Sequence, residues 1–164
     1  MKRYPDDLVA TDLNRKMVLV TGPRQVGKTT LCRHIMERFQ PSQYLNWDVG
    51  PDRAVLRRQS WNPRSSLLAM DGIHKVPGWK NWLKSVVDGH SPGPALLVTG
   101  SARMETWRQS RDSLAGRYLA FRLHPVSVRE WCEQQGGTPA AALERLMTRG
   151  GFPEPCLVDN PDDA

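Results

Sequence analysis

The glycine-rich segment at residues 22–29 is the part of this sequence whose residue types and spacing most clearly suit a chemical task. Glycines let a loop curl so that consecutive backbone N–H groups face an anion. A lysine can then reach the β- and γ-phosphates of a nucleotide, and a threonine hydroxyl can bind Mg²⁺. With the residue after it, the segment reads Gly22-Pro23-Arg24-Gln25-Val26-Gly27-Lys28-Thr29-Thr30. The spacing predicts a phosphate-binding loop for ATP and Mg²⁺, in which Lys28 contacts phosphate and Thr29 contacts the metal.

Apolar residues on both sides of this loop indicate the elements that must position it. The run Met17–Thr21 before the loop predicts a strand. After the loop, apolar residues recur at the spacing of one helix face: Leu31, Cys32, Ile35, Met36 and Phe39. A helix is therefore expected from Thr30 to Phe39, with its positive N-terminus toward the phosphates. The alternative is a glycine-rich turn that joins a strand to a helix and binds nothing.

A second candidate site residue, Asp71, follows the apolar run Leu67–Met70. A carboxylate at the end of a buried strand is placed to hold Mg²⁺ through the water shell of the metal, beside the hydroxyl of Thr29. Asp71 and Thr29 are therefore predicted to be the metal-binding residues. An aspartate that only ends a strand and caps a turn is the alternative.

Short apolar runs alternate with amphipathic segments along the chain, which is typical of a parallel sheet with helices on both faces. Strands are expected at Met17–Thr21, Gln43–Trp47, Leu67–Met70, Ala95–Thr99 and Tyr118–Leu123. Further helices are expected at Gly78–Val87, after a capping box that starts at Ser127, and from Thr138 to Gly150. The predicted fold class is α/β, with three layers (αβα) and a mainly parallel, five-stranded sheet.

The composition is that of a single soluble globular domain. Hydrophobic residues make up 39% and charged residues 24% of the 164 positions. No apolar run is long enough to span a bilayer, and the first residues lack the apolar stretch of a signal peptide. We therefore expect a cytoplasmic protein with no membrane partner, whose cysteines Cys32, Cys132 and Cys156 are reduced thiols.

The charge of the chain is strongly basic, with a net charge of +6. Arginines gather in one polar stretch, at Arg53, Arg57, Arg58 and Arg64. One interpretation is a nucleic-acid partner. The other is a solvated basic face or the counterweight to a bound triphosphate, since no recognition-helix pattern accompanies these arginines.

From the phosphate-binding loop onward, the chain resembles the prokaryotic AAA-type P-loop ATPases over almost its whole length. The resemblance rests on blocks that occur in the same order: Val20–Thr30, Tyr44–Asp48, Asp71 with Ile73–Trp79, Val98–Ser101, Ser113–Arg117, Leu123–Ser127 and Gly150–Glu154. It implies a P-loop NTPase fold that binds ATP with Mg²⁺ and acts as an ATP hydrolase. Residues 1–150 would form the AAA-type nucleotide-binding core, and residues 151–164 the truncated start of a lid or a disordered tail.

The resemblance also implies roles for individual residues. Ser101 would be the polar sensor near the γ-phosphate and the attacking water, and Arg117 would be an arginine finger supplied to a neighbouring subunit of a homo-oligomer. A serine that caps the next helix is the alternative for Ser101. An ordinary salt-bridge partner beside a strand is the alternative for Arg117. Asp48 is expected to cap the end of its strand.

Gly72 departs from the pattern of this family, which usually has a Walker B glutamate directly after the metal-binding aspartate. That glutamate orients or deprotonates the attacking water, so its absence predicts weak or absent hydrolysis with ATP and ADP binding retained. His74, two residues further on, is expected to be structural. The alternative functions are a nucleotide-gated or nucleotide-independent interaction module for nucleic acid or protein, and a small-molecule P-loop kinase.

Overall fold

A five-stranded parallel sheet forms the centre of the computed structural model, which describes residues 1–89, 93–101, 104 and 114–158. The strands lie in the order β2-β3-β4-β1-β5. Their bounds are Met17–Gly22 for β1, Ser42–Asn46 for β2, Leu67–Asp71 for β3, Ala95–Ser101 for β4 and Tyr118–Arg122 for β5. The predicted α/β fold with a five-stranded parallel sheet is thus confirmed.

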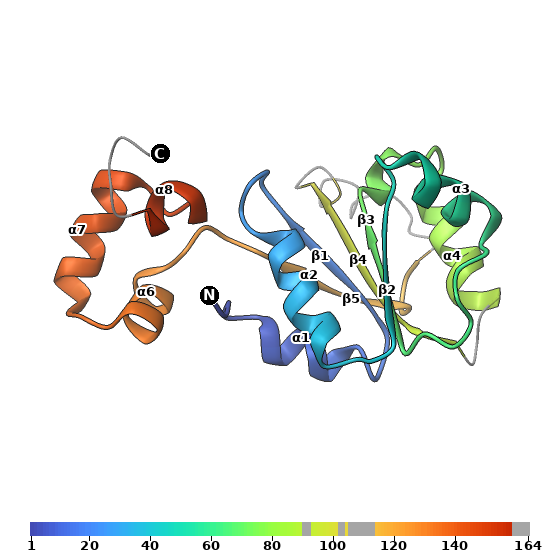
Figure 1. The fold of residues 1–164 in the computed structure, drawn as a ribbon, viewed down its shortest axis with the longest axis horizontal. Coiled ribbons are helices and arrows are strands. Elements are labelled where there is room, and N and C mark those ends of the chain that lie inside the picture. Colours follow the sequence, from blue (N-terminus) through green and yellow to red (C-terminus); the bar gives the residue numbers. More distant parts are fainter. Residues whose placement is uncertain (90–92, 102–103, 105–113, 159–164) are drawn as a thin grey trace.

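Helices cover both faces of the sheet (Figure 1). On one side lie α1 and α2, and on the other α3 and α4, while α6 to α8 form a group of their own beyond α1 and α2. The helices are α1 (Asp6–Asp12), α2 (Lys28–Glu37), α3 (Gly50–Arg58), α4 (Trp79–Gly89), α6 (Val128–Gln135), α7 (Pro139–Arg149) and α8 (Pro153–Leu157), with a 3₁₀ turn η1 at Ile73–Lys75. None of the helices in the described residues has the length and apolar character that crossing a bilayer requires.

Two apolar clusters, one on each face of the sheet, explain why β1 is buried along its whole length. Val18 and Val20 pack in the cluster that contains Leu31 and Ile35 of α2. Met17 and Leu19 pack in the other cluster, with side chains from α3 and α4. Successive side chains of a strand point to opposite faces, so a continuous apolar run is what a doubly covered parallel strand requires.

The helix ends agree with the sequence signals where those signals are local. Ser127 and Glu130 form the expected capping box of α6, and Thr138 caps α7 through the backbone N–H of Ala141. α3 was not expected, because Leu56 is its one buried residue and the rest of the helix is rich in arginine and other polar residues. Such a helix has no apolar stripe from which periodicity could predict it.

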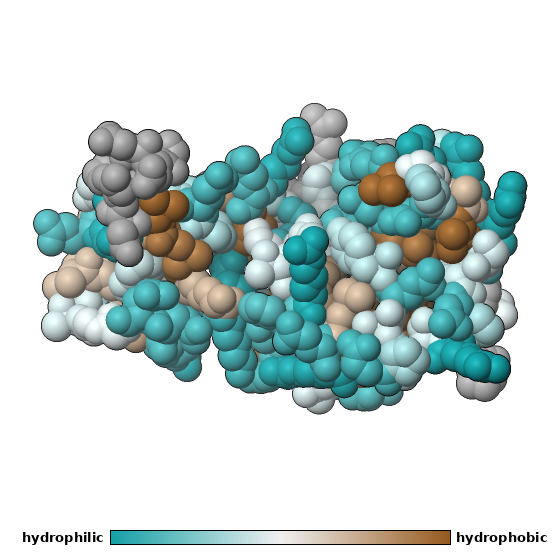
Figure 2. Space-filling view, viewed as in Figure 1, coloured by the Kyte–Doolittle hydropathy of each residue, from teal (hydrophilic) through white to brown (hydrophobic). Residues whose placement is uncertain are grey.

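The segment after residue 150 is helical and packed as far as the structure describes it. Cys156 of α8 is fully buried, and the guanidinium of Arg145 donates hydrogen bonds to the carbonyls of Cys156 and Val158. Residues 153–158 are therefore packed, whereas residues 159–164 lie outside the described residues, and the division at residue 150 stays a prediction. Apolar side chains are exposed on α7 and α8, where Figure 2 shows hydrophobic atoms; they include Leu143, Met147 and Leu157.

The chain leaves β3 through a turn at Gly72, whose φ of 76° lies in the left-handed region. A Cβ atom at this position would meet no close contact, since the nearest atom is the Cβ of Trp47 at 3.4 Å. The left-handed backbone, rather than lack of space, is therefore what favours glycine here. This turn directs the chain from Asp71 into η1.

We predict that Gly72→Ala lowers the free energy of unfolding by about 1–2 kcal/mol, because an L-residue is strained in the left-handed conformation. Urea denaturation measures this change. The matched control is Gly50→Ala at the start of α3, where a Cβ atom meets nothing within 4 Å. The control should leave stability unchanged or slightly raised. Equal stability of the Gly72→Ala variant and the unmodified chain would contradict the account of this turn.

Candidate functional site

The register of the sheet brings the carboxyl ends of neighbouring strands together at one edge. Gly22 of β1 lies opposite Ser101 of β4, and Asp71 of β3 lies opposite Thr99 of β4 and Asn46 of β2. This is the edge at which open α/β sheets bind ligands. The phosphate-binding loop, Asp71 and Ser101 are separated in sequence but meet here.

A cleft of about 760 Å³ opens at this edge. Its walls come from the loop after β1 and from the ends of β2, β3 and β4. The lining residues are Pro23, Arg24, Gln25, Lys28, Thr29, Asn46, Asp48, Asp71, Gly72, His74, Lys75, Gly100 and Ser101. The volume is within the usual range for a small-molecule site.

Five of the loop residues predicted to hold the nucleotide line this cleft, namely Pro23, Arg24, Gln25, Lys28 and Thr29. Gly22, Val26, Gly27 and Thr30 do not line it. Val26 is fully buried in the core beneath the loop, and Gly27, with a φ of 96°, turns the chain into α2. These residues shape the loop rather than face the cleft with a side chain.

The ammonium group of Lys28 is held over the loop. Its Nζ atom donates hydrogen bonds to the carbonyls of Gly22 at 3.1 Å and Pro23 at 2.6 Å. Burial lowers the pKa of Lys28 from its ordinary value, while the nearby carboxylate of Asp71 acts in the opposite direction. A half-buried cation whose partners are neutral carbonyls is an apt partner for a phosphate group.

The Asp71 carboxylate accepts three side-chain hydrogen bonds. Its Oδ2 atom accepts from the hydroxyls of Thr29 at 3.1 Å and Tyr44 at 2.7 Å, and its Oδ1 atom accepts from Thr99 at 2.6 Å. Thr29 and Asp71, the two predicted metal-binding residues, are thus in direct contact. A carboxylate and a hydroxyl offer the hard oxygen donors that Mg²⁺ prefers, so the residues present fit that ion.

The contributions of Tyr44 and Thr99 to the site were not predicted. Tyr44 belongs to a sequence block that resembles the family, but no local pattern shows that its hydroxyl reaches a carboxylate 27 residues away. Burial raises the pKa of Tyr44 first, and the hydrogen bond to Asp71 raises it further. The tyrosine therefore stays a neutral donor. A signal could have been found in the strand alternation, since Tyr44 and Asn46 share one face of β2.

Two buried polar atoms of the cleft have no hydrogen-bond partner within the described part of the chain. They are Nδ1 of His74 and Oγ of Ser101, and both residues line the cleft. Burial lowers the pKa of His74, and the charge of Lys75 lowers it further. The imidazole is therefore neutral near pH 7. Both atoms are free to bond a ligand or a water molecule.

The rim of the cleft beyond Gly72 carries an ion pair. The Nζ atom of Lys75 lies 2.6 Å from a carboxylate oxygen of Asp48, and about half of each side chain is exposed. Asp48 also donates its backbone N–H to the side chain of Asn46, which closes the turn after β2. The side chain of Asn46, rather than that of Asp48, therefore caps the end of β2, and the Asp48 carboxylate instead holds Lys75 beside the cleft.

Arg117 does not lie in this cleft. It precedes β5, whose first residue, Tyr118, pairs with Met17, so Arg117 is at the opposite edge of the sheet from the phosphate-binding loop. Its guanidinium forms a partly exposed ion pair with Asp88 at 2.8 Å, which raises the pKa of Arg117 and lowers that of Asp88. Within one chain Arg117 is a salt-bridge partner. A role toward a neighbouring subunit stays a prediction.

The arginine-rich stretch lies on and after α3. The guanidinium carbon of Arg57 lies 5.4 Å from the centre of the Trp47 ring, and Arg53 donates to the carbonyl of Asp48 at 3.4 Å. These two arginines therefore take part in packing the end of β2 against α3 as well as adding positive charge.

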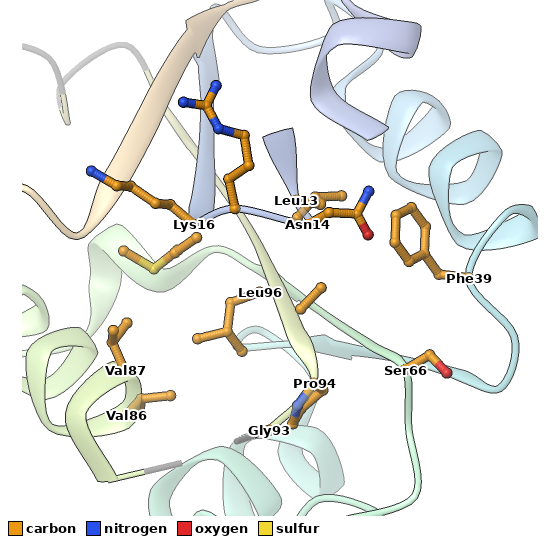
Figure 3. Close-up of a pocket in the computed structure, with 13 residues that line it drawn as sticks. Leu13, Asn14, Lys16, Phe39, Ser66, Val86, Val87, Gly93, Pro94 and Leu96 are labelled. Atoms are coloured by element: carbon orange, nitrogen blue, oxygen red, sulfur yellow. The ribbon is translucent and has the colours of Figure 1, made fainter. Parts of the chain in front are cut away.

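A second pocket, of about 560 Å³, opens at the amino ends of the strands (Figure 3). Apolar side chains such as Phe39, Val86 and Leu96 line it, together with the more polar Asn14, Lys16 and Ser66. Among the residues that the structure describes, its lining contains neither a phosphate-binding loop nor a carboxylate. The cleft at the carboxyl ends is therefore the better candidate for the functional site.

Curated relatives are similar over most of this chain. The uncharacterized proteins Rv2008c of Mycobacterium tuberculosis and Mb2031c of Mycobacterium bovis are each 29% identical over 150 residues, which is 90% of this chain. The chain spans about a third of the length of these relatives, 32% in each case.

Solved structures share the fold at low sequence identity. The Hsp104–ADP complex of S. cerevisiae has a TM-score of 0.61 at 14% identity, and the match covers 93% of this chain and 28% of that one. A Walker-type ATPase of Pyrococcus abyssi has a TM-score of 0.57 at 14% identity, covering 93% and 64%. The Aeropyrum pernix ORC1 protein in complex with DNA has a TM-score of 0.55 at 13% identity, covering 88% and 50%.

The sequence model of the AAA domain family matches residues 14–132, which include the phosphate-binding loop, Asp71, the helices α2, α3 and α4 and all five strands of the sheet. This match extends over more than half of the 164 residues. The chain therefore belongs to the AAA domain family.

Proposed function

We propose that this chain binds ATP and ADP with Mg²⁺ in the cleft at the carboxyl ends of the strands, and that it hydrolyses ATP weakly or not at all. The observation that supports the proposal most directly is the contact between Thr29 and Asp71, at 3.1 Å, beside the ammonium of Lys28. One cleft is therefore lined by an ammonium group that can bind phosphate and by a hydroxyl and a carboxylate that can bind a metal ion. The match to the AAA domain family supports the same conclusion.

Each group in the cleft has a distinct task in this proposal. Lys28 would exchange its bonds to loop carbonyls for bonds to the β- and γ-phosphates, and the N-terminus of α2 would add its dipole. Thr29 and Asp71 would hold Mg²⁺, which supplies positive charge to the phosphate oxygens when bound. Arg24 and Gln25 line the outer part of the loop and would limit access of solvent.

The reaction with water is the step that these residues support poorly. Gly72 has no side chain to orient the attacking water, and positioning of the nucleophile is most of what a protein contributes to phosphoryl transfer. Ser101 Oγ would sense the γ-phosphate from the end of β4. His74 Nδ1 is the other buried cleft atom without a partner in the described residues.

We predict that Lys28→Ala weakens ATP binding without unfolding the chain. Loss of one charge-assisted contact to phosphate costs on the order of 1.5–3 kcal/mol, which corresponds to about 10- to 150-fold in Kd. Isothermal titration calorimetry with ATP and Mg²⁺ measures the change. Lys84→Ala on α4, which does not line the cleft, is the control and should bind as the unmodified chain does. No nucleotide binding by the unmodified chain would refute the proposed function.

We also predict slow turnover. A water-orienting carboxylate is worth about 10²–10⁴-fold, and typical enzymes turn over about ten times per second, so phosphate release of about 0.1 per second or slower is expected. Gly72→Glu would not restore the glutamate cleanly, because the left-handed backbone strains any side chain at that position. Rapid phosphate release by the unmodified chain would disprove weak hydrolysis. His74→Asn and Ser101→Ala would then identify the group that holds the water.

Arg117 is proposed to act on the nucleotide of a neighbouring subunit in a homo-oligomer. Residual turnover per chain should then rise with protein concentration and be lost in Arg117→Ala, since a finger is worth about 10³–10⁵-fold in competent enzymes. Asp88→Ala is the control, because it breaks the same ion pair but leaves the arginine. Turnover that does not depend on concentration would leave Arg117 with its role as the partner of Asp88.

Nucleic-acid binding is a second candidate function. The net charge of +6 favours it, and ORC1, whose structure contains DNA, shares the fold. Binding to phosphate backbones weakens steeply with salt. Fluorescence anisotropy of a labelled DNA duplex, with and without ATP, would separate this function from nucleotide binding. Measurements at about 50 and about 200 mM salt would show the dependence on salt. Salt-sensitive binding that ignores ATP would favour it.

A further inference from the structure

Arg3, near the start of the chain, is an almost completely buried arginine. Its side chain is 4% exposed, and its guanidinium donates three hydrogen bonds to three different parts of the fold. Nη1 donates to the carbonyl of Val26 in the phosphate-binding loop at 2.8 Å, and Nη2 to the carbonyl of His124 at 2.7 Å. Nε donates to Glu130 of α6 at 3.0 Å. Burying this charge is costly unless each contact is kept.

Glu130 is equally buried and is itself held from several sides. Its Oε1 atom accepts from Arg3 and from the backbone N–H of Tyr4 at 2.9 Å, and its Oε2 atom accepts from the backbone N–H of Ser127 at 2.9 Å. Burial alone would raise the pKa of Glu130, but the hydrogen bonds from Tyr4, Ser127 and Arg3 outweigh it and lower the pKa. The carboxylate therefore stays ionised, and it fixes the start of α6 to the N-terminal segment.

Arg3 holds the back of the phosphate-binding loop through Val26, and the start of α8 lies close to the same part of the loop. A Cβ atom on Gly27 would lie 3.5 Å from Nη1 of Arg3 and 3.7 Å from Cγ of Pro153, the first residue of α8. The backbone N–H of Val126 also donates to the carbonyl of Gly151 at 2.6 Å, which ties the start of α8 to the segment after β5. Figure 1 shows the N-terminus between α1 and α6, which is where a residue that joins the loop to α6 must lie.

We infer that Arg3 is a positioning residue that couples the phosphate-binding loop to the helices α6 to α8. Because Val26 and Glu130 share one guanidinium, a shift of the loop on nucleotide binding changes the geometry of the hydrogen bond to α6, and a shift of α6 changes the loop. The effect is reciprocal. If a bound nucleotide changes the affinity of the helices α6 to α8 for a partner, that partner changes the affinity for nucleotide by the same factor. This inference rests on the proposed nucleotide binding and adds a route by which that site is regulated.

The test is amide hydrogen exchange on the full chain, with and without saturating ATP and Mg²⁺. In the unmodified chain, ATP slows exchange both in the loop, at residues 22–31, and in the helices, at residues 128–157. In Arg3→Lys, which keeps the charge but lacks the fork of directed donors, the slowing persists in the loop and is lost in the helices. We expect the Kd of Arg3→Lys for ATP to be about tenfold higher than that of the unmodified chain, a size that is ordinary for coupling between two sites.

Arg129→Lys is the matched control, since Arg129 lies next to Glu130 on α6 but pairs with Glu133 on the surface. It should leave both the Kd and the exchange pattern unchanged. If Arg3→Lys fails to fold, Glu130→Gln gives the same loss of slowing in the helices, because it removes the charge and replaces one accepting oxygen by an amide donor, while Arg3 keeps its bond to Val26.

The outcomes separate the coupling from the proposed function. If Arg3 is only structural, Arg3→Lys speeds exchange in the helices equally with and without ATP, and the slowing caused by ATP stays as in the unmodified chain; this result overturns the coupling alone. An unmodified chain that binds no ATP overturns both.

Discussion

The carboxylate of Asp71 is the group on which the geometry of the cleft depends. It ends β3 and accepts hydrogen bonds from Tyr44 of β2, Thr99 of β4 and Thr29 of α2. An ionised carboxylate only accepts hydrogen bonds, so every neighbour must turn a donor toward it. The position of α2, and with it the phosphate-binding loop, is therefore fixed relative to three strands by one half-buried group.

This arrangement limits how Asp71 can bind a metal ion. A carboxylate has about four lone-pair sites, and three side-chain hydroxyls already use its two oxygens. A second or third direct ligand bond would require a neighbour to turn away. Contact through the water shell of Mg²⁺ is compatible with the hydroxyls as they lie, and Mg²⁺ gives up its waters reluctantly. One direct bond to a metal ion is also compatible with three hydroxyls, so the water-mediated role of Asp71 stays a prediction.

The sequence predicted those features whose signals are local. The loop at residues 22–29, the strands around it and the caps at Ser127 and Thr138 each depend on a few consecutive residues. The hydroxyl of Tyr44 and the bond from Arg3 to Glu130 could not be predicted, because the partners are 27 and 127 residues apart. No periodicity encodes which buried polar groups meet across such separations. The backbone conformation of Gly72 was missed for a related reason, since only the path from β3 into η1 requires it.

The backbone turn at Gly72 affects the cleft in a second way, besides the absence of a side chain at this position. A Cβ atom has room at this position, so the difference is more than a missing side chain. The left-handed backbone at Gly72 directs the chain into η1, which carries His74 and Lys75 into the wall of the cleft. Asp48 then neutralises Lys75 at 2.6 Å, while Nδ1 of His74 keeps no partner among the described residues. If hydrolysis is as weak as we propose, a carboxylate at position 72 would not restore it without a different turn, because the backbone and the side chain at this position depend on each other.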